Sequence, residues 1–198
     1  MTHFAGEYPE MVTALVYVEA AYNRASARDS MAAYEAPESE LRPPSAADSA
    51  SAEAYQAYYA RANGVTMPLS EIRAMYRWTP DGRLSGGVTP GWIYSRIIDS
   101  LRDPDYSGID TPALAIYATH YPVTELFLDY DTRDSVTQLA MRKYHEASLR
   151  TAKLSRDHFR AHMLNRRVVE IRGAGHSLYI THAQETLDAM RAFLAEVL

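Results

Sequence analysis

Three short, largely apolar runs constrain the fold of this chain more than any other feature. They are VTALVYV at residues 12–18, TPALAIYA at 111–118 and RVVEI at 167–171. Runs of this kind, without strict polar and apolar alternation, are typical of strands that are buried on both faces of a parallel sheet. An amphipathic stretch at 135–164 separates the second run from the third, and a helical pattern at 183–198 follows the third. This order of elements predicts an α/β fold with a small parallel sheet of about three strands and flanking helices.

The composition changes between the first run and the second. A Pro-, Ser- and Ala-rich loop is predicted at residues 36–54, followed by helices at 50–62, 68–77 and 90–101. No strand-like alternation of useful length occurs in this region. We therefore predict a core made of residues 1–24 and 109–198, with an inserted helical domain at 25–108.

Aromatic residues gather on one face of the first inserted helix. Tyr55, Tyr58 and Tyr59 are spaced i, i+3 and i+4, which places them side by side on a helix. Two interpretations stay open: these tyrosines pack a small helical core, or they line a ligand pocket.

The composition argues against several classes of protein. The 198 residues include 20 basic and 25 acidic side chains, a formal net charge of −5, whereas a nonspecific nucleic-acid binder depends on clustered positive charge. The absence of cysteine excludes disulfides, thiolate zinc sites and thiol nucleophiles. No apolar run approaches the roughly 18 residues of a membrane span, and the N-terminus has no signal-peptide pattern. We expect a cytoplasmic protein that binds neither nucleic acid nor membranes.

Two polar side chains follow predicted strands at the edge where functional groups gather in open parallel sheets. Glu19 comes directly after the first run, and His176 follows the third run across the turn Gly173-Ala174-Gly175. Glycines in such a turn permit positive φ and close backbone approach, so the histidine can project from the sheet edge. A carboxylate bonded to one ring nitrogen fixes the tautomer of a histidine that accepts protons at the other. We predict that Glu19 and His176 form this pair.

The order of elements resembles the C-terminal half of the α/β-hydrolase fold. The segment at 4–24 resembles the helix after the nucleophile turn together with the next strand, and 111–118 resembles the penultimate strand. The segment at 168–194 is similar to the last strand, the catalytic-histidine loop and the final helix, and 25–108 occupies the place of the cap domain.

The resemblance implies roles for particular residues. His176 would be the general base and Glu19 its orienting acid, with Glu125 and Asp129 as the next candidates for the acid. The parent activity would be esterase-like hydrolysis of a small ester- or amide-type bond without a cofactor. The cap would provide an apolar-leaning substrate site, formed by Tyr55, Tyr58, Tyr59, Tyr76, Trp78 and Trp92.

The chain departs from the family at the nucleophile. No serine has glycines at both −2 and +2, as the Gly-x-Ser-x-Gly turn requires, and Ser85 in DGRLSGG is the nearest approach. The resemblance places the nucleophile just upstream of Met1. We therefore expect a truncated chain that is a poor catalyst by itself, with an unpaired apolar edge at its first strand.

Two further hypotheses compete with a hydrolase fragment. One is a non-catalytic binding protein that pairs through the open sheet edge, as a homodimer or with another partner. The other is a chain that hardly folds alone. A metal site is not expected: His158 and His162 have the i, i+4 spacing of two ligands, but no third ligand is apparent.

Overall fold

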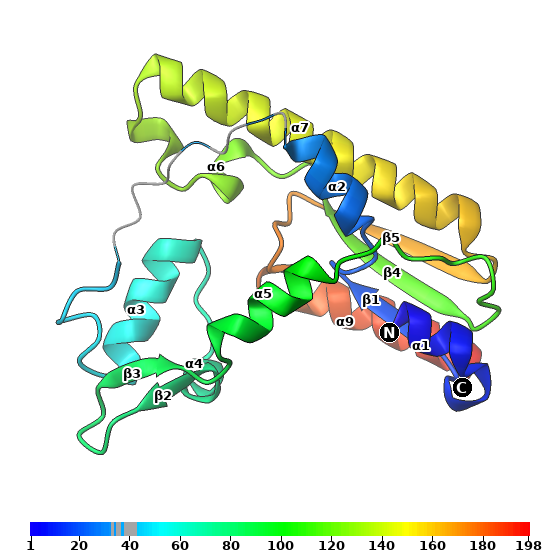
Figure 1. Cartoon of the computed structure of the whole chain (residues 1–198), viewed down its shortest axis with the longest axis horizontal. Helices are drawn as coiled ribbons and strands as arrows, with labels where there is room; N and C mark the ends of the chain where they lie inside the picture. The colour runs from blue at the N-terminus through cyan, green and yellow to red at the C-terminus, as the bar shows by residue number, and fades with distance from the viewer. Residues whose placement is uncertain (33, 35–36, 38–42) are drawn as a thin grey trace. The chain divides into compact units, whose positions relative to one another are not determined.

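The computed structural model describes residues 1–32, 34, 37 and 43–198, and the chain forms two compact units (Figure 1). The first unit comprises Met1–Pro37, Arg102–Leu126 and Arg133–Leu198, and the second comprises Glu38–Leu101 and Phe127–Thr132. Apart from residues 127–132, the second unit falls within the predicted insertion at 25–108. That this unit is a cap domain stays a prediction.

A three-stranded parallel sheet forms the centre of the first unit. Its strands are β1 (Leu15–Val18), β4 (Ala113–Thr119) and β5 (Arg166–Arg172), in the order β1-β4-β5. All of β4 is buried, as its place between two neighbours requires. The predicted α/β fold with a small parallel sheet and flanking helices is confirmed, and the carboxyl ends of its three strands lie at one edge.

Different helices cover the two faces of this sheet (Figure 1). On one face, Phe159 of the long helix α7 packs against Tyr17 of β1, together with Ala5 of α1. On the other face, Phe193 of α9 packs in a cluster with Ile116 of β4. Complete burial of a side chain such as Phe159 contributes about 2 kcal/mol to the free energy of unfolding. The helical elements of the unit are α1 (Thr2–Glu7), η1 (Pro9–Met11), α2 (Arg24–Met31), α6 (Val123–Leu126), α7 (Ser135–His162), α8 (Leu178–Thr181) and α9 (Ala183–Val197).

Helix α7 begins at a side-chain cap. The Asp134 carboxylate accepts hydrogen bonds from the backbone N–H groups of Val136 (2.9 Å) and Thr137 (3.0 Å). These donors have no partner within the helix, so an aspartate at this position fixes where the helix starts. Hydrogen bonds from the Thr137 hydroxyl and backbone hold the pKa of Asp134 below its ordinary value.

The second unit combines helices with a β-hairpin. Its helices occupy the predicted places, and α3 is capped by the Ser51 hydroxyl, which accepts from the Ala54 N–H at 3.1 Å. Of the loop predicted at 36–54, residues 36 and 38–42 lie outside the described part, and 43–51 contain neither helix nor strand. The elements are α3 (Ala52–Asn63), α4 (Leu69–Met75), β2 (Tyr76–Trp78), β3 (Leu84–Gly87), α5 (Gly91–Asp99) and η2 (Tyr130–Thr132).

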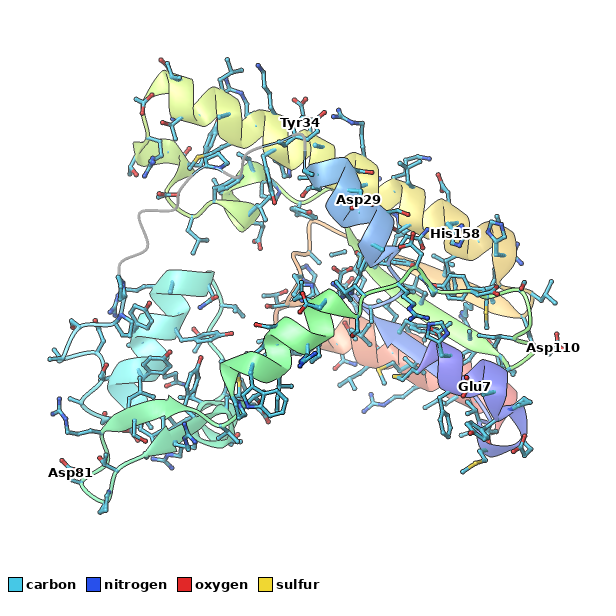
Figure 2. The ribbon with its side chains drawn as sticks, in the orientation of Figure 1. Glu7, Asp29, Tyr34, Asp81, Asp110 and His158 are labelled. Carbon is cyan, nitrogen blue, oxygen red and sulfur yellow. The ribbon has the colours of Figure 1, made fainter. Side chains whose placement is uncertain are left out.

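The prediction of a purely helical insertion is wrong at the hairpin formed by β2 and β3. These antiparallel strands are joined by a turn in which the Gly82 N–H donates to the Thr79 carbonyl at 2.9 Å. Gly82 has φ +83°, a left-handed conformation that glycine adopts without steric cost. The Thr79 hydroxyl donates to Asp81, which Figure 2 labels at the tip of the turn. Strands of three and four residues are too short to give a periodic signal.

Among the residues that the structure describes, no helix is both long enough and apolar enough to cross a membrane.

Candidate functional site

Glu19 ends strand β1 in an unusual backbone conformation. Its φ is +50°, a left-handed value that is uncommon outside glycine, and its N–H still donates to the Ile116 carbonyl at 3.0 Å. The residue is 7% exposed, and Oε1 accepts from the Ala118 N–H at 2.5 Å. The Glu19 carboxylate thus accepts the hydrogen bond from β4 that a backbone carbonyl would accept if strand β1 continued.

A second left-handed residue lies at the same edge of the sheet. His120 directly follows β4 and has φ +56°. Strained backbone of this kind costs about 1 kcal/mol or more and is concentrated at functional sites. Its occurrence after two neighbouring strands, at Glu19 and at His120, marks the carboxyl edge as the candidate site.

The loop after β5 carries His176 to this edge. The Gly173 N–H donates to the Thr119 carbonyl at 2.7 Å, which extends the pairing of β4 with β5 by one bond. Gly173 has φ +80° and turns the chain, while Ala174 is buried and anchors the loop. The His176 side chain is 76% exposed, so the imidazole projects from the sheet edge.

The structure brings the predicted pair together. Nδ1 of His176 lies 3.4 Å from Oε2 of Glu19, although 157 residues separate them along the chain. Because Glu19 is buried and Oε1 is already bonded, Oε2 is the oxygen that remains for the imidazole. With Nδ1 directed to Glu19, Nε2 is the ring nitrogen left for another partner.

Tyr22 bonds to Glu19, and Arg156 lies beside Tyr117 of the neighbouring strand β4; no sequence pattern pointed to either residue. The Tyr22 hydroxyl donates to Oε1 of Glu19 at 2.9 Å, and burial, followed by the Glu19 charge, raises the pKa of Tyr22 far above its ordinary value. The Arg156 guanidinium on α7 is buried 5.9 Å from the centre of the Tyr117 ring. Its Nε has no hydrogen-bond partner in the described part of the chain, and Glu170 lies 3.9 Å away. A buried cation therefore lies between the Tyr117 ring of β4 and Glu170 of β5.

The two substitute candidates for the acid lie in different units. Glu125, on α6, is next to the histidine loop: a Cβ on Gly175 would collide with the Glu125 carboxylate. Asp129 belongs to the second unit. The carboxylate within reach of Nδ1 of His176 as an acceptor is that of Glu19.

The six predicted substrate-binding aromatics lie in the second unit, most of them packed together. Tyr55 is buried, with its ring 5.5 Å from Tyr58, 4.6 Å from Tyr76 and 6.3 Å from Trp78. These contacts make the four rings a small core. Tyr59 is half-buried and Trp92 is 67% exposed.

Tyr76 also lines a cavity of about 400 Å³ in the same unit. The other lining residues include Met75, Val88 and Tyr94, which give the cavity an apolar wall. Both interpretations of the aromatics therefore have a structural counterpart, a packed cluster and an open cavity.

Neither of the remaining chemical motifs forms a site. His158 and His162 stack on α7 with ring centres 4.1 Å apart, and Figure 2 labels His158 on that helix. In the described ranges, no group of three or more His, Asp or Glu residues could hold a metal ion. Ser85 is an exposed residue of strand β3 in the hairpin, not a residue on a strand-to-helix turn.

The fold and the site define an α/β protein with a carboxylate–imidazole pair at the carboxyl edge of its parallel sheet. Comparison with protein-family models, with curated proteins and with solved structures gives no match. Function is therefore argued from the geometry of this edge.

Proposed function

We propose that this chain is part of an α/β-hydrolase-like protein that hydrolyses a small ester- or amide-type bond. The observation that supports the proposal is the 3.4 Å approach of His176 to Glu19, from the ends of two strands that are not neighbours in the sheet. The resemblance of the element order to that fold and the strained backbone at Glu19 add to it.

In this proposal, His176 is the general base and Glu19 is the acid that orients it. The carboxylate holds the proton on Nδ1 and stabilises the imidazolium that forms when Nε2 takes a proton. A separation of 3.4 Å is long for a hydrogen bond, and such contacts tighten when substrate binds. Tyr22 and the Ala118 N–H keep Glu19 in place from the other side.

The substrate would be small and apolar, and the second unit would act as the cap that binds it. The cavity beside Tyr76, about 400 Å³ in volume, is large enough for a short acyl or aryl group. The nucleophile would be a Ser, Asp or Cys on a strand-to-helix turn directly before α1. No cofactor enters this chemistry.

The proposal is tested first by the reading frame of the gene. In-frame codons for a Gly-x-Ser-x-Gly-type turn, within about ten residues upstream of Met1, would support it. An absent or unrelated frame would contradict it.

The second test measures hydrolysis of a short-chain nitrophenyl ester by the chain extended through that turn. His176→Ala is expected to reduce kcat to the uncatalysed background, and Glu19→Gln to lower it at least about 100-fold through loss of the tautomer. His162→Ala, on the exposed side of α7, is the matched control and should leave kcat unchanged. Equal activity of the wild type and His176→Ala would exclude the role given to His176.

A second candidate function is non-catalytic pairing through the sheet edge. In the described part of the chain, β1 has one partner strand, β4, and its other edge carries no strand. The four residues of β1 are uncharged, so this edge lacks the charges with which proteins protect such strands. This function predicts self-association without turnover.

A further inference from the structure

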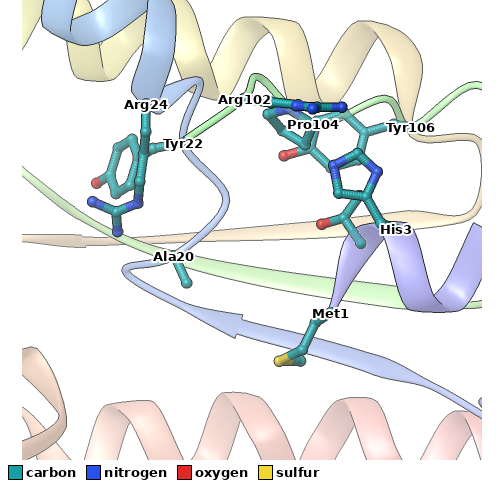
Figure 3. Close-up of a pocket in the computed structure, with 9 residues that line it drawn as sticks. Met1, His3, Ala20, Tyr22, Arg24, Arg102, Pro104 and Tyr106 are labelled. Atoms are coloured by element: carbon teal, nitrogen blue, oxygen red, sulfur yellow. The ribbon is translucent and has the colours of Figure 1, made fainter. Parts of the chain in front are cut away.

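A pocket in the first unit has several basic side chains in its wall. The pocket has a volume of about 170 Å³ and is lined by residues of α1, of the segment after β1, of α2 and of the segment that enters the first unit at Arg102 (Figure 3). His3, Arg24 and Arg102 all contribute to its wall. Three basic side chains around one small pocket are unexpected in a chain with a net charge of −5.

Arg24 and Arg102 have no charged partner in the described part of the chain. Among the described residues, Arg102 forms no hydrogen bond or ion pair, and the contact of Arg24 is with the Tyr22 ring, 5.9 Å from the guanidinium carbon to the ring centre. Both side chains are exposed at the pocket. Their donors are therefore available to a ligand, and a guanidinium is charged at every physiological pH.

The acidic side chains near the pocket are already occupied. Asp103, next to Arg102 in the chain, accepts from the backbone N–H groups of Ala25 (3.0 Å) and Ser26 (3.1 Å) at the start of α2. Burial alone would raise the pKa of Asp103, but these bonds and the Ser26 hydroxyl hold the pKa below its ordinary value. Asp105 accepts from Ser107 in the same way. Neither carboxylate is paired with Arg24 or Arg102.

A buried hydroxyl group in the pocket wall has no partner. Tyr106 is 1% exposed and lines the pocket, and its hydroxyl makes no hydrogen bond in the described structure. A buried polar atom without a partner costs free energy, and an acceptor beside it would recover that free energy. Burial raises the pKa of Tyr106 well above its ordinary value, so the group is a neutral donor.

We propose that this pocket binds the oxyanion group of a small molecule, a phosphate or a carboxylate. The Arg24 and Arg102 guanidinium groups would donate charge-assisted hydrogen bonds to it, and the planar fork of arginine matches both groups. The His3 imidazole adds a further polar group, and the Tyr106 hydroxyl gains an acceptor. A volume of several water molecules suits a group of this size. The pocket adjoins the acid–base pair proposed for His176, because Tyr22, which donates to Glu19, also lines the pocket.

The test is a calorimetric titration of the whole chain with inorganic phosphate and, separately, with acetate, at equal ionic strength. Saturable binding of either anion is expected, and the tighter one identifies the group. Arg24→Gln and Arg102→Gln should each weaken binding about tenfold, as loss of one charge-assisted hydrogen bond does. Tyr106→Phe should weaken it at least about threefold, by loss of a neutral one.

Arg191→Gln is the matched control. Arg191 is an exposed arginine of α9 that lies outside the pocket, so its loss removes the same charge without touching the site, and affinity should be unchanged. Circular dichroism verifies that each variant is folded. No saturable binding of either anion, or equal affinity of the wild type, Arg24→Gln and Arg102→Gln, would overturn the proposal. Equal affinity of Tyr106→Phe would remove the hydroxyl from the site.

Discussion

Gly173 and Gly175 flank Ala174 in the loop that carries His176, and each is glycine for a different reason. Gly173 has φ +80°, and no atom lies within 4 Å of the place where a Cβ would be. Glycine is therefore favoured at this position by the backbone conformation and not by a lack of space for a side chain. Gly175 has no left-handed backbone, but a Cβ there would collide with the end of the Glu125 side chain. The sequence predicted that the glycines of this turn permit positive φ and close backbone approach. It did not show which glycine serves which purpose.

Gly173→Ala is expected to lower the free energy of unfolding by about 1 kcal/mol, since an L-residue is strained at positive φ. Gly175→Ala should cost less, because the flexible Glu125 side chain can turn aside. Urea denaturation of the wild type and of both variants measures these differences. Gly108→Ala, where a Cβ would meet no atom and φ is not positive, is the control and should stay within about 0.5 kcal/mol. A Gly173→Ala variant as stable as the wild type would contradict this explanation.

The tautomer of His176 tests its pairing with Glu19 without any need for activity. A carboxylate at Nδ1 favours the ring with its proton on that nitrogen. We expect nitrogen NMR of the neutral imidazole to show the Nδ1–H form in the wild type. In Glu19→Ala, this preference should fall to that of the free imidazole. A wild-type ring with its proton on Nε2 would exclude Glu19 as its acceptor.

Sequence order was enough to predict this residue pair, because parallel strands bring their carboxyl ends to one edge whatever the length of chain between them. Tyr22 and Arg156 could not be predicted in the same way. Tyr22 reaches Glu19 from a loop without regular structure, and Arg156 is one of several basic residues on a long amphipathic helix. Their positions depend on tertiary packing, which leaves no local pattern.

At the scale of elements, long and strongly patterned segments were predictable and short ones were not. The prediction of a helix at 135–164 agrees with α7 because the apolar period persists over many turns and Asp134 caps its start. The hairpin of β2 and β3 was missed, since its strands are short and pack through contacts distant in sequence, such as Tyr55 with Tyr76. The Asp81-Gly82 pair was the available turn signal.

Helix α7 is joined to strand β5 by ion pairs at Glu170. Its carboxylate bonds to Arg160 and lies 3.9 Å from Arg156. The hydrogen bond from Arg160 lowers the pKa of Glu170 below its ordinary value of 4.5, with smaller effects from the Arg156 and Arg160 charges. A carboxyl group whose pKa is lower in the folded state contributes stability above its ordinary pKa, and this is lost as the pH falls through the folded-state value.

The difference in unfolding free energy between the wild type and Glu170→Gln should therefore be largest near neutral pH and shrink below pH 4.5. Thermal unfolding followed by circular dichroism over that range measures it. The Arg160→Gln background serves as the control, because the pH dependence should be weaker there. An unchanged difference between neutral pH and pH 3 would show that this carboxylate is not stabilised by its arginines.

At the scale of the whole molecule, the strand order in the described part of the chain leaves two open edges with different protection. The outer strand β5 carries Arg166, Arg167, Glu170 and Arg172, whereas β1 is the uncharged LVYV. Charged side chains oppose pairing of an edge strand with another chain. The sequence predicted an open edge at β1 from the resemblance to the α/β-hydrolase fold, which places the preceding strands upstream of Met1.

If β1 pairs with a second copy of the chain, its outward backbone groups must be free to bond. Leu15 and Glu19 direct their N–H groups to β4, so Val16 and Val18, which alternate with them, direct theirs away from it. Proline lacks an N–H and is tolerated at such outward positions of edge strands. Val16→Pro should therefore spare the β1–β4 pairing and remove one donor from the exposed edge.

Sedimentation equilibrium over a range of concentrations measures the result. We expect a reversible dimer in the wild type and at least about tenfold weaker dimerisation in Val16→Pro. Val168→Pro is the matched control, since Val168 alternates with the residues of β5 that bond to β4 and lies on the opposite edge of the sheet. Its dimerisation should equal that of the wild type, because the charges of β5 already oppose pairing there. A wild type that is monomeric at every concentration, or a dimer weakened by Val168→Pro and not by Val16→Pro, would exclude β1 as the pairing edge.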